Sequence, residues 1–117
     1  MTRTVEVVYP GHLNHHGTLF GGEALRMMDT AAFFAATRHA RRTMVTVAVG
    51  RVEYEAPVHE GEIVEIDAEV SGTGRSSVTV EVEMHAETLL TGARRRCGRG
   101  RFVFVALDED GRPTAVG

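Results

Sequence analysis

One helical segment followed by several alternating stretches constrains the fold of this chain more than any other feature. The segment from about Glu23 to His39 is rich in Ala, Leu and Met, which favours a helix. Its centre, Ala31 to Ala36, is apolar all round, and this predicts burial on more than one side. Since the chain offers no second long helix to pack against it, a sheet must cover this one.

Alternation of apolar and polar residues predicts that sheet. Five segments show strand patterns, namely Val5–Val8, Val45–Ala56, Val64–Val70, Val78–Met84 and Arg101–Leu107. The second changes phase after Gly50, which indicates a β-bulge. The third and fourth alternate apolar residues with mostly acidic ones, as in a sheet with one face in water. We predict one α+β domain over residues 1–117, in which a five-stranded antiparallel sheet wraps around one helix, in the order strand, helix, four strands.

Composition narrows the classes of function. The 117 residues suffice for one domain with its own core. All 13 basic residues are Arg, against 16 acidic ones, and the net charge of -3 argues against general binding to nucleic acid or anionic membrane. The longest apolar run is too short to cross a bilayer, and Glu6 stands where a secretion signal would be apolar. We expect a cytoplasmic protein whose single cysteine, Cys97, packs rather than reacts.

Asp29 breaks the helical pattern. Its same-face neighbours include Leu25, Ala32 and Phe33, so the carboxylate is expected to face apolar surroundings, where an isolated charge is costly. Two interpretations stay open at this point. The carboxylate either bonds to a backbone or arginine partner and positions the helix, or is kept for chemistry.

Gly21 and Gly22 stand at the expected start of the helix. Bare backbone would let a ligand approach the free N–H groups of the first turn, which can polarise a carbonyl or bind an anion. Alternatively, glycine only caps a tight loop. With Asp29 about two turns further along, the pair would supply an electrophile-activating end and a carboxylate in one site.

Two other polar clusters are expected to be solvated. Three histidines share one loop, at His12, His15 and His16, without Cys, Asp or Glu at ligand spacing, so we predict no metal site. The run Arg94–Arg96, with Arg99 and Arg101, could contact phosphate groups, but no aromatic residue interleaves it. We expect a solvated loop and strand start there, and no nucleic-acid partner.

Several motifs follow one another in a fixed order. The most specific is Asn14-x-x-Gly17-x-x-x-Gly21-Gly22, followed by Met28-Asp29. Further ones are Val45–Val49, Gly74–Ser77 and Phe102–Ala106 before Asp110–Arg112. In this order, from Asn14 to about Pro113, they resemble the cytosolic acyl-CoA thioesterases of the hotdog fold, the acyl-CoA hydrolase family that includes the brain-type enzymes.

The resemblance implies a helix enclosed by its sheet and a homodimer whose sheets join edge to edge, often assembled into a trimer of dimers. It implies hydrolysis of acyl-CoA to fatty acid and CoA, in active sites between subunits. Asp29 matches the catalytic carboxylate, as general base or nucleophile, Asn14 its partner amide from the other protomer, and the Gly22 N–H the group that polarises the carbonyl. The implied substrate-binding residues are Gly21, Val47, Val49, Arg75, Ser76 and Ser77, the last three on CoA phosphates or pantetheine.

A thioester is already activated, so we expect neither a metal nor a redox cofactor. The three loop histidines lie outside the family pattern and leave the acyl chain length open. The chain ends soon after Pro113, and we expect no contacts from a longer tail to CoA. Alternatives are a CoA-binding regulatory module without hydrolysis, an acyl-thioester dehydratase, which would need a His beside the carboxylate, and a purely structural protein.

Overall fold

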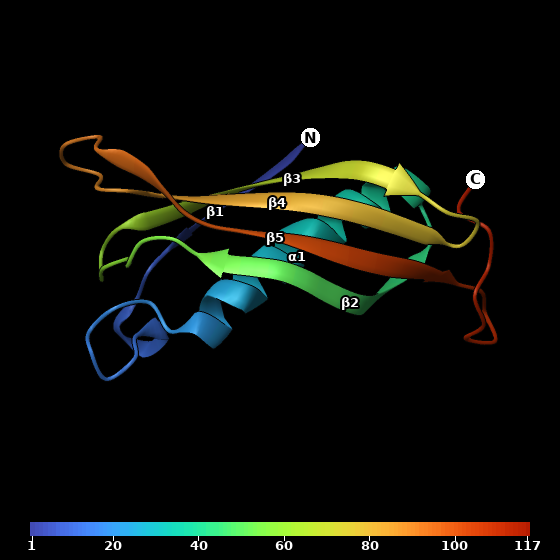
Figure 1. Cartoon of the computed structure of the whole chain (residues 1–117), viewed down its shortest axis with the longest axis horizontal. Helices are drawn as coiled ribbons and strands as arrows, with labels where there is room; N and C mark the ends of the chain where they lie inside the picture. Colours follow the sequence, from blue (N-terminus) through green and yellow to red (C-terminus); the bar gives the residue numbers. More distant parts are fainter.

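The computed structural model describes residues 1–117 and shows one long helix lying across a five-stranded sheet (Figure 1). The elements in chain order are β1 (Thr2–Val7), the short 3-10 helix η1 (Pro10–His12), α1 (Gly21–Ala40), β2 (Thr43–Tyr54), β3 (Ile63–Thr73), β4 (Ser77–Glu87) and β5 (Arg94–Leu107). The strand order is β1-β3-β4-β5-β2, and every neighbouring pair is antiparallel. The predicted order of elements and the antiparallel sheet are therefore confirmed. α1 is not long and apolar enough to span a membrane.

The core lies between α1 and the inner face of the sheet. The strands contribute the apolar residues of their alternating pattern, and Phe102 and Phe104 of β5 are fully buried. The helix contributes mainly methionines and alanines, at Met27, Met28, Ala31, Ala32, Ala35 and Ala36. Small side chains let the helix approach the sheet closely, and each large buried side chain stabilises the fold by about 1.5–3 kcal/mol.

All elements begin earlier than the sequence predicts, and β1, for example, starts at Thr2 rather than at Val5. α1 starts at Gly21 rather than near Glu23, and β5 starts at Arg94 rather than near Arg101. The first half of β5 was not recognised because arginines replace its apolar alternation. The side chains of Arg94 and Arg96 lie on the charged outer face, and Arg95 binds the buried Glu62. The prediction of a solvated loop at Arg94–Arg96 is wrong.

β2 is an edge strand of the sheet and carries a bulge where its pattern changes phase. Its register against β5 shifts between Gly50 and Glu53, which confirms the predicted bulge. The left-handed backbone is found at Arg51, with φ 51°, and not at the glycine before it. The other edge of β2 has no strand beside it, and Val47 is 55% exposed there.

The two ends of the sheet differ in what they carry. Tyr54, at the end of β2, donates a hydrogen bond from its hydroxyl to the Gly21 carbonyl (2.8 Å), so the start of α1 lies at this glycine end. At the opposite end, where α1 stops and Arg41 follows, Thr43 pairs with Leu107 and Ser77 with Val105. We call it the arginine end; the C-terminus also lies there (Figure 1).

Candidate active site

Asn14 shapes the loop that leads into α1. Its side-chain oxygen accepts hydrogen bonds from the backbone N–H of His16 (2.9 Å) and of Thr18 (3.2 Å), and its amide nitrogen donates to the Thr18 hydroxyl (3.0 Å). Gly17 completes the turn with φ 81°, a conformation that glycine adopts without strain. Within one chain, the Asn14 amide therefore holds its own loop.

The backbone at Gly22 is bare, and an aromatic ring lies against it. A Cβ at Gly22 would come within 2.7 Å of Cε1 of the Phe20 ring, which is itself 54% exposed. The N–H groups of Gly21 and Gly22 have no hydrogen-bond acceptor, as expected in the first turn of a helix. A side chain at Gly22 would have to displace this ring, and the two free donors lie at the positive end of the helix dipole.

Asp29 lies in the third turn of α1 and is only half-buried. Its Oδ1 accepts a hydrogen bond from the hydroxyl of Thr46 in β2 (2.9 Å). The expected apolar burial is therefore wrong for a single protomer, because this side of α1 faces the edge strand and no further strand covers it. The expected backbone or arginine partner is likewise absent.

The sequence reasoning missed Thr46. By the period of a strand, Thr46 shares the helix-facing side of β2 with Met44, which is buried. The sequence signal that could have identified Thr46 is its hydroxyl within the otherwise apolar stretch Val45–Val49.

Asp29 and Gly22 do not meet within one chain. Seven residues of helix separate them, or about 10 Å along the axis. Asn14 has no hydrogen bond to Asp29 either. One protomer therefore presents two half-sites, a carboxylate with its hydroxyl partner and a loop with free N–H groups.

Apart from Gly21, the predicted substrate-binding residues lie away from the glycine end. Val47 and Val49 are exposed on the open edge of β2. Arg75 is exposed in the β3–β4 turn at the arginine end, and its side chain has no carboxylate partner. The Ser76 carbonyl accepts the Ala106 N–H (2.8 Å), which joins this turn to β5.

The loop histidines do not form a cluster with other ligand residues. Nδ1 of His12 accepts the Tyr9 N–H (3.1 Å), and the rings of His15 and His16 stack with centroids 3.9 Å apart. Nowhere in the chain do three His, Cys, Asp or Glu side chains gather in a way that could hold a metal ion.

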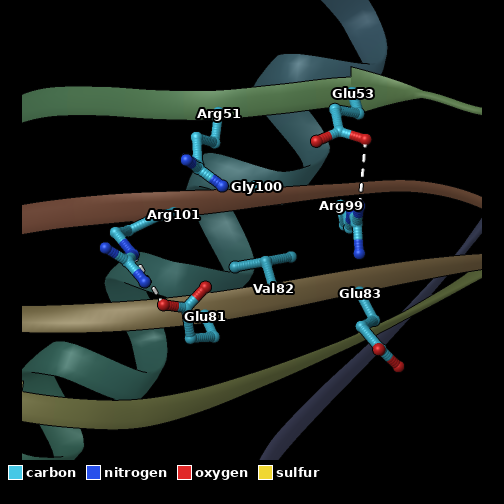
Figure 2. A pocket seen from close by; sticks show the side chains of 8 residues that line it. All are labelled: Arg51, Glu53, Glu81, Val82, Glu83, Arg99, Gly100 and Arg101. Atoms are coloured by element: carbon cyan, nitrogen blue, oxygen red, sulfur yellow. Dashed lines mark hydrogen bonds and ion pairs between the residues drawn. The ribbon is translucent and has the colours of Figure 1, made fainter.

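The arginines of β5 are paired with carboxylates on the outer face of the sheet. Arg101 bonds to Glu81 (2.7 Å) and Arg99 to Glu53 (3.1 Å), and Arg94 and Arg96 are paired in the same way. A hollow of about 270 Å³ lies on this face, and Figure 2 shows the side chains that line it, Arg51 among them. Since α1 lies behind the strands in this view, the hollow is separate from the Asp29 side.

Glu62 is a buried carboxylate that sequence reasoning did not single out. It accepts two hydrogen bonds from Arg95 (2.8 Å each), one from the His59 N–H (2.8 Å) and one from the Thr88 hydroxyl (2.9 Å). Chiefly because of Arg95, the pKa of this carboxyl is lowered to about 2. Glu62 thereby holds the β2–β3 connection, and Val58 of that connection accepts the Leu19 N–H of the Asn14 loop (2.8 Å).

Comparison with known proteins shows to which family this chain belongs. Residues 16–93 match the family model of the thioesterase superfamily. The chain belongs to the thioesterase superfamily. The family resemblance and the hotdog fold predicted from the sequence are thus confirmed for this thioesterase-superfamily protein.

Two relatives of this thioesterase-superfamily protein bear on its function. One is an uncharacterized acyl-CoA thioester hydrolase of Bacillus subtilis, 37% identical over 93% of this chain. The chain spans 63% of the length of that relative. The other is the rat cytosolic acyl coenzyme A thioester hydrolase, 25% identical over 96% of this chain and 30% of its own.

Solved structures agree in fold. A hexameric acyl-CoA thioesterase, in its apo form, matches with a TM-score of 0.94 and 35% identity over 97% of this chain and 73% of its own. An acyl-CoA hydrolase of Staphylococcus aureus, in complex with butyryl coenzyme A, matches with a TM-score of 0.90 and 31% identity, over 97% and 69%. Variants of the latter replace an aspartate or a threonine by alanine, and those two positions are 17 residues apart, as are Asp29 and Thr46 here.

Proposed function

We propose that this protein hydrolyses acyl-CoA thioesters to free fatty acid and CoA. The observation that carries the proposal is the Asp29 carboxylate, held by the Thr46 hydroxyl on a helix whose first two N–H groups are free. The acyl-CoA hydrolases among its relatives support the substrate class. The rat relative, named as cytosolic, supports a cytoplasmic location.

The chemistry needs water activation and polarisation of one carbonyl. Sulfur delocalises poorly into the thioester carbonyl and thiolate leaves readily, so the reaction requires no metal or redox cofactor. Asp29 takes a proton from the attacking water, or attacks the carbonyl itself to form an anhydride. The Gly22 N–H donates to the developing oxyanion, a contribution of about 3–4 kcal/mol for such a donor in other enzymes. Asn14 orients the water or the thioester beside them.

We propose that two protomers complete each site. The 10 Å or so of helix between Gly22 and Asp29 is too long for both to act on one carbonyl. A homodimer joined along the open edges of β2 would pair the unused backbone groups of that strand and cover Val47 and Val49. The hexameric relative supports assembly into an oligomer, and a trimer of dimers would account for it. Each site would combine Asp29 of one protomer with Asn14 and Gly22 of the other.

The substrate arm is proposed to leave this interface along the protein surface. Val47 and Val49 would flank the pantetheine arm, beside Gly21. The turn formed by Arg75, Ser76 and Ser77 would hold CoA phosphates.

Thiol release from acyl-CoA esters of rising chain length tests the proposal directly. We expect Asp29→Asn to keep the fold and lose turnover at least a hundredfold. Asp110→Asn, an exposed aspartate in the β5 C-terminal turn, is the matched control and should behave as wild type. Near-normal hydrolysis by Asp29→Asn would remove the catalytic assignment. CoA binding without thiol release by the wild type would favour a binding module, and hydration of an enoyl-CoA a dehydratase.

A mixing experiment tests the shared site. Asp29→Asn and Asn14→Ala chains, each inactive alone, are unfolded together and refolded in equal amounts. Half of the dimers are then mixed and hold one intact site of two, so about a quarter of wild-type activity should return. Separately refolded chains, combined without exchange, are the control. No recovery after co-refolding would show that each site belongs to one chain.

A further inference from the structure

Seven of the 13 arginines are paired with carboxylates, among them Arg94, Arg96, Arg99 and Arg101 on the outer face of the sheet. Of the six without an ion pair, Arg51 lies on that outer face. The other five lie at the arginine end, and they are Arg38, Arg41, Arg42, Arg75 and Arg112. Unpaired guanidinium groups are free to bind an anion, in the bidentate geometry that suits carboxylates and phosphates.

Two of these arginines stand at the rim of a groove. It has a volume of about 580 Å³ and is lined by Phe33, Thr37, Arg41, Arg42, Thr43 and Met44. Phe33 is 39% exposed there. The hydroxyl of Thr37 is buried and has no hydrogen-bond partner, although such groups are normally satisfied. The groove therefore combines an apolar wall with two unpaired cations at its rim, and an unpartnered hydroxyl is buried beneath it.

The groove continues the face of α1 that carries Asp29. Asp29, Phe33 and Thr37 are spaced four residues apart along α1, so each lies beside the next on the helix surface, and Arg41 follows directly after the helix ends. Thr37 lies about 12 Å and Arg41 about 18 Å from Asp29 along the axis. On the β2 side, Met44 lines the groove, and Thr46, two residues further on, bonds to Asp29.

The conformation of Arg41 is an independent sign that its side chain matters. Arg41 ends α1 with φ 52°, a left-handed position that glycine or asparagine usually occupies. Another residue is disfavoured there by about 1 kcal/mol. The helix dipole attracts cations to the last turn, but Arg38 and His39 already supply them. Dipole compensation therefore does not require an arginine at the strained position.

We propose that Arg41 and Arg42 bind an anionic group of the thioester substrate, at the far end of a groove that begins at Asp29. This rests on the proposed hydrolysis of acyl-CoA. The chemistry recognised is a carboxylate or a phosphate, which has two possible sources, the far end of a dicarboxylic acyl group or a phosphate of CoA. Asp108 and Glu109 line a neighbouring cavity with the two arginines but form no ion pair with either.

Steady-state kinetics with three thioesters separate the sources. Hexanoyl-CoA and adipyl-CoA have acyl chains of equal length and differ in one terminal carboxylate, and hexanoyl-3′-dephospho-CoA lacks one phosphate. The variant is Arg41→Asn with Arg42→Gln, because asparagine tolerates the left-handed φ and the fold is kept. The control is Arg51→Asn, which removes another unpaired arginine with φ 51° on the outer face.

A lost charge-assisted contact should raise KM about tenfold. If the rise is confined to adipyl-CoA, the arginines bind the acyl carboxylate. If the rise in KM is equal for hexanoyl-CoA and adipyl-CoA, the arginines bind a CoA phosphate. If KM does not rise with hexanoyl-3′-dephospho-CoA, that phosphate is the 3′-phosphate. KM values unchanged for all three, or an equal effect of Arg51→Asn, would overturn the proposal.

A binding measurement keeps this test separate from hydrolysis. Calorimetric titration of Asp29→Asn with the same three esters should show the same loss of affinity when Arg41 and Arg42 are replaced. If the wild type releases no thiol, and replacing Arg41 and Arg42 still lowers the affinity for the esters, the hydrolysis is refuted and the anion site stands. If the wild type releases thiol, and replacing the two arginines leaves the affinity unchanged, the anion site is refuted and the hydrolysis stands.

Discussion

The buried carboxylate of Glu62 makes a quantitative prediction about stability. Its pKa is lowered to about 2 in the folded protein, against about 4.3 for an unperturbed glutamate. A difference of just over two units corresponds to about 3 kcal/mol of folding free energy at neutral pH. The Arg95 side chain is 35% exposed, and solvent screening there reduces the figure to about 2–3 kcal/mol.

The sign of the pH dependence follows from the direction of the shift. Because the folded pKa lies below the unfolded one, the stabilisation is complete above about pH 4.3 and is lost as the pH falls toward 2. We expect Glu62→Gln to lower the free energy of unfolding by about 2–3 kcal/mol at pH 7. The gap between variant and wild type should narrow steadily between pH 4.3 and pH 2.

Urea unfolding followed by circular dichroism measures this gap, at one protomer concentration so that oligomerisation does not enter. Glu60→Gln, an exposed glutamate in the same connection, removes the same charge and should leave stability nearly unchanged. A Glu62→Gln variant as stable as wild type at pH 7, or a gap that stays constant with pH, would refute the reasoning. Because Glu62 holds the connection that supports the Asn14 loop, the variant should also lose turnover.

Three further predictions concern other parts of the molecule. Gly22→Ala displaces the half-exposed Phe20 ring, so it should keep the fold but lower turnover at least tenfold; full activity by thiol release would contradict the role of the bare backbone. Val47→Lys on the open edge of β2 should reduce the mass seen by light scattering, whereas Val5→Lys on the opposite edge strand should not, and an unchanged mass for both would exclude the β2 interface. Burial raises the pKa of the Cys97 thiol to about 11, so a thiol reagent at pH 8 should label Cys97 only in denaturant. Rapid labelling of the native protein would show that Cys97 is accessible to the reagent.

Periodicity predicted the fold well where one face of an element is apolar. The alternation of β3 and β4 and the phase change at Gly50 were confirmed, because both reflect which side chains face the helix. The first half of β5 was missed for the opposite reason. Arg94 to Arg96 carry no apolar alternation, and their place in the sheet is shown only by their backbone pairing with the last residues of β4.

The site was less accessible to sequence reasoning, because its parts meet across elements. The break at Asp29 in an apolar face was visible, but its partner Thr46 lies on a strand whose position beside that turn depends on the whole sheet. Glu62 was missed for the same reason, since its partners come from the β4–β5 connection, from β5 and from the loop before β3. The half-burial of Asp29 follows from an open sheet edge, which no local pattern reveals.

The charged ladder on the outer face has a consequence for how β4 and β5 find their alignment. Glu81 and Glu83 of β4 lie opposite Arg101 and Arg99 of β5, and a slip by two residues would keep one of these two pairs. Because an exposed ion pair contributes only about 0–1 kcal/mol, electrostatics selects the native alignment weakly. The inner face selects it more strongly, because even a Cβ at Gly100 would come within 3.2 Å of Val52, and a two-residue slip would place a phenylalanine ring at this crowded position. The missing side chain, rather than the rows of charge, is what distinguishes one alignment from its neighbours.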